Sequence, residues 1–108
     1  MGYTNLVRYQ ITSTAIFNKW LRGLRDRQAV KAIALRLARA EAGNLGDIAP
    51  VGGCVSEMRI FVGKGHRIYI ATRNERLITL LCGGTKSRKK QQQQDIRRVL
   101  SILGELED

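Results

Sequence analysis

A β-hairpin predicted in the middle of the chain places charged side chains together on one face. Residues 55–62 and 66–71 alternate polar and apolar side chains, and a Gly-Lys-Gly turn at 63–65 joins them. Because successive side chains of a strand point to opposite faces, the polar set shares one face. This set consists of Glu57, Arg59, Arg67 and Tyr69. Lys86 follows the next predicted strand and could approach it. Such a face suits binding of an anion, or ordinary cross-strand ion pairs worth only about 0.2–1 kcal/mol each.

The overall charge favours an anionic partner, most often a nucleic acid. The 108 residues include 19 Lys and Arg against 9 Asp and Glu, a net charge of +10, and 44% are hydrophobic. We therefore expect one folded domain spanning residues 1–108. The helical cations, among them Arg22, Arg25 and Arg36, are compatible with solvated helix faces. The segment 86–98 is denser, and its six cations favour contact with a polyanion. They are Lys86, Arg88, Lys89, Lys90, Arg97 and Arg98.

Several protein classes are disfavoured. No run of 18 apolar residues exists and no signal peptide is recognisable, so we expect a cytoplasmic protein without a membrane partner. Cys54 and Cys82 lack CxxC spacing, and His66 is the single histidine. We therefore expect no metal site and no cofactor.

A strand and two helices are predicted before the hairpin. Residues 3–12 alternate like a strand, and Thr12 or Ser13 offers a helix N-cap. A helix from Ala15 follows, with one apolar stripe formed by Phe17, Trp20, Leu21 and Leu24. The alanine-rich segment 28–42 predicts a second helix.

The remaining segments complete an α+β fold. We expect an irregular connection at 46–53, a central strand at 77–82 ended by two glycines, and a helix at 90–106. The inward face of that helix would carry Ile96, Val99, Leu100 and Leu103. The order β-α-α-β-β-β-α predicts a small, antiparallel-rich twisted sheet with helices on one side and the two N-terminal helices packed on one face.

Five short motifs are weak singly but specific in their order and spacing. They are FNKWL at 17–21, GNLGD at 43–47, VSEMRI at 55–60, GHRIY at 65–69 and LLCGGTKS at 80–87. Together they resemble the RelE/ParE toxin superfamily, and most closely its HigB-like branch of addiction module killer proteins. The likeness covers about residues 7–103. The sequence departs from the branch at His66, where the branch usually has Tyr or Phe. It also departs after Lys86, where about three additional residues precede Asp95 and Ile96.

The resemblance implies a RelE-like fold and the toxin of a type II toxin–antitoxin system. Such toxins commonly cleave messenger RNA in the ribosomal A site without a metal ion. Their partners are the ribosome, messenger RNA and a small antitoxin, which in this branch is typically a helix-turn-helix DNA-binding protein. Two alternatives stay open: a gyrase-poisoning toxin of the same superfamily, and a non-catalytic basic module that binds RNA or the ribosome.

The resemblance also suggests roles for individual residues. Attack of the ribose 2′-OH on phosphorus needs a base, positive charge on the phosphorane and an acid. Glu57 is the candidate base, while Arg59, Arg67 and Lys86 would hold the scissile phosphate. Tyr69 would stack on a base or orient the RNA backbone. Further RNA contacts are expected from Arg22, Arg25, Arg36, Arg88, Lys89, Lys90 and Gln92, the last by counting back from Asp95. Because neighbouring strand residues point to opposite faces, His66 lies on the other face of the sheet from Arg67, which favours a packing role for His66.

Overall fold

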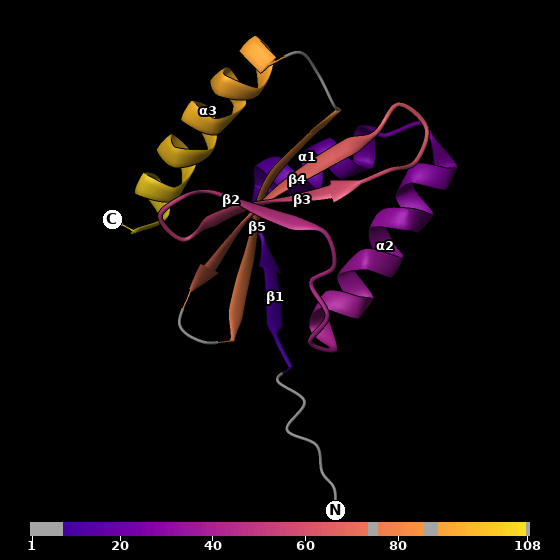
Figure 1. The fold of residues 1–108 in the computed structure, drawn as a ribbon, viewed down its shortest axis with the longest axis horizontal. Coiled ribbons are helices and arrows are strands. Elements are labelled where there is room, and N and C mark those ends of the chain that lie inside the picture. Colours follow the sequence, from indigo (N-terminus) through magenta and orange to yellow (C-terminus); the bar gives the residue numbers. More distant parts are fainter. Residues whose placement is uncertain (1–7, 74–75, 86–88, 108) are drawn as a thin grey trace, which may run out of the picture.

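The computed structural model describes residues 8–73, 76–85 and 89–107, without the side chains of 89–93, 95, 106 and 107. The described elements are β1 (Gln10–Ser13), α1 (Ala15–Gly23), α2 (Arg27–Glu41), β2 (Ile48–Gly52), β3 (Val55–Ile60), β4 (His66–Arg73), β5 (Leu77–Thr85) and α3 (Lys89–Glu107). They form one sheet in the order β1-β5-β4-β3-β2, in which β1 runs parallel to β5 and every other pair is antiparallel (Figure 1). The α+β class is confirmed.

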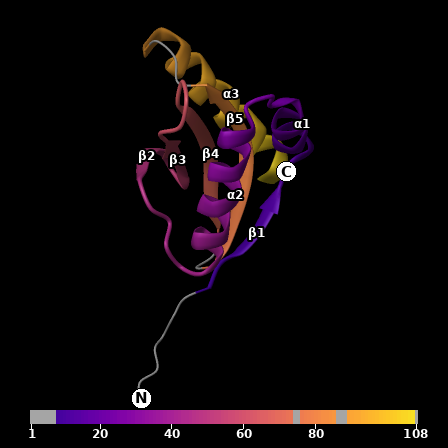
Figure 2. The ribbon, with the colours of Figure 1, turned by 90° about the vertical axis from the view of Figure 1, so that its right-hand side faces the viewer.

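Helices cover both faces of the sheet. Phe17 of α1 and Ile33 of α2 pack against the even-numbered side chains of β3 and β4, such as Met58 and Ile68. Figure 2 shows α2 in front of the sheet, and Figure 1 shows α3 on the opposite side. The two N-terminal helices therefore share a face as expected. The prediction of helices on one side only was wrong, because apolar residues of α3, such as Val99, find a second apolar surface on the sheet.

A bulge in β5 couples the sheet to α1. Tyr69 pairs with Cys82, but its neighbour Ile70 pairs with Leu80, so Leu81 is the extra residue. Leu81 and Cys82 both pack on the α3 side. The Thr14 hydroxyl donates to the Leu81 carbonyl at 2.6 Å and accepts from the Phe17 N–H at 3.0 Å, so Thr14 is the N-cap of α1. The expected caps Thr12 and Ser13 are wrong because both still belong to β1.

The segment expected to be irregular contains an additional strand. Residues 48–52 pair with β3 as the edge strand β2, which tolerates Pro50 because one side of an edge strand needs no N–H donor. Strand β5 also continues through Gly83 and Gly84 to Thr85 instead of ending at Cys82. The prediction that Leu100 faces inward was wrong, because its side chain is 45% exposed. Ile102 of α3 is buried instead.

No helix of the described ranges is long and apolar enough to cross a membrane.

We expect Gly83→Ala to destabilise the protein by about 1–3 kcal/mol through overpacking. A β-carbon at Gly83 would overlap Cε3 and Cζ3 of the Trp20 ring. The free energy of unfolding in urea is the measurement, and Gly23→Ala is the control. A β-carbon at Gly23 meets no atom within 4 Å, and alanine is the better helix former. Equal stability of the two variants would contradict the close contact between Gly83 and Trp20.

Candidate functional site

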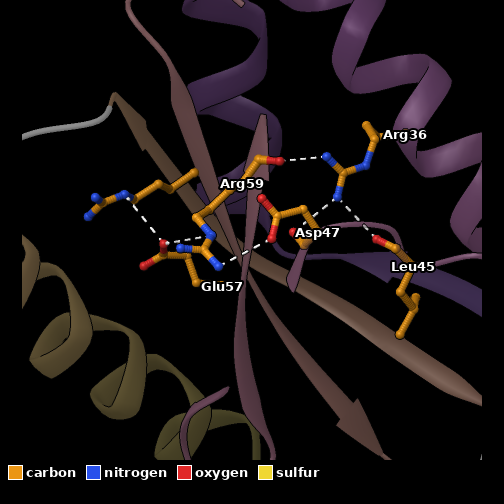
Figure 3. A network of polar contacts seen from close by, with 6 residues as sticks. Arg36, Leu45, Asp47, Glu57 and Arg59 are labelled. Carbon is orange, nitrogen blue, oxygen red and sulfur yellow. Dashed lines mark hydrogen bonds and ion pairs between the residues drawn. The ribbon is translucent and has the colours of Figure 1, made fainter. Parts of the chain in front are cut away.

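The charged face of the hairpin forms a connected network of ion pairs. Glu57 Oε1 lies 3.5 Å from Arg67 Nε and 4.0 Å from Arg59 Nε. Arg59 Nη2 also lies 3.2 Å from Asp47 Oδ1, which belongs to the connection between α2 and β2 (Figure 3). The structure therefore brings together three of the four predicted catalytic residues, Glu57, Arg59 and Arg67. The fourth, Lys86, lies outside the described residues.

Strand pairing explains why Glu57 is needed between these arginines. Arg59 and Arg67 stand directly opposite each other in the β3–β4 register, an arrangement of like charges that is unfavourable by itself. Glu57, two residues before Arg59 on the same face, supplies the compensating charge. Its side chain is 3% exposed, against 12% for Arg67 and 41% for Arg59.

The face changes character along the hairpin. At its far end Val55 pairs with Ala71, and both belong to the apolar cluster under α3. Next comes the pair of Glu57 and Tyr69, and the two arginines follow nearest the turn. The predicted polar residues do share one face, but that face is exposed only near the turn. Glu57 is at the boundary between the part that α3 covers and the part that carries exposed charge.

Tyr69 does not have the position expected of an RNA-stacking residue. It is 1% exposed and belongs to the buried cluster that includes Leu81 and Val99. The alternation of β4 did predict its side of the sheet. The packing of α3 on that side removes it from solvent.

Arg36 connects α2 to the neighbouring backbone through hydrogen bonds. Its guanidinium donates to the carbonyls of Arg59, Leu45 and Asp47, the last two at 3.1 and 3.2 Å (Figure 3). Burial lowers the pKa of Arg36 from its ordinary value, and the Asp47 carboxylate opposes that shift. A β-carbon at Gly46, whose φ is +69°, would lie 2.9 Å from Arg36 Nε. The expected RNA contact of Arg36 stays a prediction, since these hydrogen bonds give the side chain a role within the fold.

A small hollow opens beside the arginine pair at the hairpin end. It is lined by Arg59, Ile60, Phe61, Gly65, His66 and Arg67. Within the described part of the chain, Arg67 Nη1 is buried and has no hydrogen-bond partner. Among the described side chains, the three guanidiniums of Arg36, Arg59 and Arg67 lie near two carboxylates, Asp47 and Glu57, so this set of five carries one net positive charge. The arrangement suits an anion that accepts from Arg59 and Arg67.

His66 is buried at 6% exposure, which agrees with the predicted packing role. Its ring meets Trp20 edge-on, with ring centroids 6.3 Å apart. Both ring nitrogens lack a hydrogen-bond partner among the described residues, and His66 also lines the hollow.

Two of the other expected RNA contacts can be compared with this hollow. Arg22 and Arg25 are exposed, in α1 and in the turn that follows it, and neither lines the hollow. Arg88 lies outside the described residues. Lys89, Lys90 and Gln92 belong to the start of α3, but their side chains are not described. A separate pocket of about 630 Å³ has Lys19, Trp20 and Arg98 among its lining residues, from α1 and α3.

Sequence reasoning missed Phe61. Its side chain is 68% exposed and lines the hollow beside both arginines. Phe61 lies two residues after Arg59 and four after Glu57, so the alternation of the strand places it on the same face as both. That alternation was the available signal, although residue 61 lies one position beyond the end of β3.

The chain is similar to a curated protein of Haemophilus influenzae that is described as an uncharacterized protein. The two are 39% identical over 97 residues, which cover 90% of this chain and 95% of the relative. No family model matches the chain.

We expect Glu57→Ala to lower the free energy of unfolding by about 3–5 kcal/mol, because it leaves opposed arginines without their buried counter-charge. Asp47→Ala is the matched control, since it removes the other carboxylate of the network from a half-exposed position. That loss should stay below about 1 kcal/mol. Urea unfolding measures both values. Equal losses would show that Glu57 is not the centre of the network.

Proposed function

We propose that this chain, which belongs to the same family as the uncharacterized Haemophilus influenzae protein, is the toxin of a type II toxin–antitoxin system and a ribosome-dependent messenger RNA endoribonuclease. The observation that carries the proposal is the opposed pair of Arg59 and Arg67, held by the buried Glu57 and adjoining a hollow. The resemblance to the RelE/ParE superfamily supplies the reaction class.

The proposed reaction needs no group beyond RNA and protein. The ribose 2′-oxygen attacks the adjacent phosphorus, and the bond from phosphorus to the 5′-oxygen breaks. The products are a 2′,3′-cyclic phosphate and a 5′-hydroxyl. A base takes the proton of the 2′-OH, and an acid protonates the leaving 5′-oxygen.

In this proposal, Arg59 and Arg67 bind the scissile phosphate and stabilise the additional negative charge of the phosphorane. Their orientation is set before the substrate arrives, because Glu57 pairs with both Nε atoms. Arg67 Nη1 has no acceptor among the described residues, but it is buried. In the proposed reaction, a local rearrangement beside the hollow exposes it to a phosphate oxygen. Lys86, a few residues after Gly84, which pairs with Arg67, would add a third cation.

The role of Glu57 as a base depends on its release from the arginines. In the described conformation its carboxylate is buried and ion-paired, so it does not meet a substrate. An incoming phosphate competes for the same two guanidiniums. In the proposed reaction this competition frees Glu57 to accept the 2′-OH proton.

The burial of Glu57 also favours a second candidate function, a non-catalytic module that binds RNA or the ribosome. In that case Glu57 would only orient Arg59 and Arg67, and bound RNA would stay intact. The toxin proposal further implies a small antitoxin partner, typically a helix-turn-helix DNA-binding protein, and a cytoplasmic location.

We expect Arg67→Ala to lower the rate of messenger RNA cleavage in a translating extract by about 100-fold or more, because the variant loses a cation proposed to stabilise the phosphorane. Growth inhibition on expression should disappear with it. Arg39→Ala is the control, since Arg39 is an exposed arginine of α2 that does not line the hollow. Arg67→Lys keeps the charge but loses the planar guanidinium, so its cleavage rate should lie between those of Arg67→Ala and Arg39→Ala.

The same extract separates the candidates. Messenger RNA that stays intact while translation stops and RNA remains bound contradicts cleavage and supports the binding module. Loss of DNA supercoiling with unaffected translation supports the gyrase-poisoning alternative. Wild-type toxicity in a folded Arg67→Ala variant contradicts the assigned site.

A further inference from the structure

We infer that Phe61 is a stacking platform for a nucleobase of single-stranded RNA, next to the phosphate that Arg59 and Arg67 bind. The inference deepens the proposed function and rests on it for the identity of the ligand. Phe61 directly follows the last residue of β3 and lines the same hollow as both arginines. One hollow therefore combines cations for a phosphate with an aromatic ring for a base.

Phe61 differs from an ordinary exposed apolar residue. The described residues include three large hydrophobic side chains with high exposure: Phe61 at 68%, Leu35 at 52% and Leu100 at 45%. Single exposed aliphatic residues are common on protein surfaces and carry no implication. Leu35 and Leu100 are aliphatic, lie on helices and do not line the hollow. Phe61 is the most exposed of the three, and it alone has a flat π-face beside guanidiniums.

The backbone on both sides of Phe61 is anchored. Ile60, before it, is 3% exposed in the main core, and Val62, after it, packs against the same core. The Gly65 N–H donates to the Val62 carbonyl at 2.9 Å, and Gly63 and Gly65 have the positive φ angles that this turn requires. The ring is thus presented to solvent from a braced segment, which reduces the entropy lost when a base stacks on it.

The chemistry of the hollow selects the ligand class. Every nucleobase offers a π-face, but in a duplex both faces are already stacked. A protein aromatic ring therefore contacts bases of single strands. The neighbouring guanidiniums suit the phosphodiester of the same strand. A messenger RNA segment opened for cleavage presents both groups.

The decisive test separates stacking from charge. The probe is a fluorescein-labelled 2′-O-methyl decaadenylate, which cannot be cleaved because its 2′-oxygens are blocked. The comparison probe is an abasic decamer of equal length and charge. Fluorescence anisotropy at one fixed ionic strength gives the dissociation constants, since salt alone changes such affinities. We expect the wild-type chain to bind the base-bearing decamer about tenfold more tightly, which corresponds to the energy of stacking one base.

The variants test the aromatic face itself. Phe61→Leu keeps an apolar side chain but loses the ring, so the preference for the base-bearing decamer should vanish. Phe61→Tyr should retain the preference. Leu35→Ala, the matched exposed control on α2, should bind like the wild type. A Phe61→Leu chain that keeps the tenfold preference overturns the inference, and so does a wild-type chain without any preference.

The two proposals fail in different ways. Intact messenger RNA in the extract, with the Phe61-dependent preference for bases present, removes the nuclease function and leaves the stacking platform. Cleavage that depends on Arg67, with no effect of Phe61→Leu on binding or on cleavage rate, removes the platform and leaves the nuclease function.

Discussion

The contact of the Glu57 carboxylate with two arginines is the interaction on which the charged end of the sheet depends. The β3–β4 register places Arg59 directly opposite Arg67. Two cations in that position repel each other unless an anion lies close to both, and Glu57 Oε1 is within 4.0 Å of each Nε. The cost of burying Glu57 is offset by this pairing.

The parts around this contact hold it in place from two directions. On one side, the guanidinium of Arg36 ties α2 to the connection before β2 and to the Arg59 carbonyl, which fixes Asp47 beside Arg59. On the other side, the bulge at Leu81, bound by Thr14, turns two successive residues of β5 toward α3. Leu81 and Cys82 thus extend the apolar surface on which α3 packs, and α3 covers Tyr69. The apolar part of this face is therefore separate from the part that carries Arg59 and Arg67.

The basic composition of the chain therefore has several physical roles. Arg36 is used inside the fold, where its donors satisfy backbone carbonyls. Arg59 and Arg67 form a pair oriented by Glu57 and line a hollow. Exposed cations such as Arg22 and Arg25 remain to strengthen attraction to a polyanion over longer range. The proposed nuclease and its stacking platform both rely on the second group, because Arg59 and Arg67 line the same hollow as Phe61.

The sequence by itself determined the hairpin, its turn and the shared side of Glu57, Arg59 and Arg67, because alternation along a strand is a local property of the backbone. It also determined both N-terminal helices, whose apolar stripes repeat with the helical period. Only the tertiary structure decided which members of that face meet solvent. Tyr69 is covered by a helix that begins 20 residues later, and the donors of Arg36 are taken by carbonyls 9 to 23 residues away. Burial depends on such distant partners, and periodicity carries no information about them.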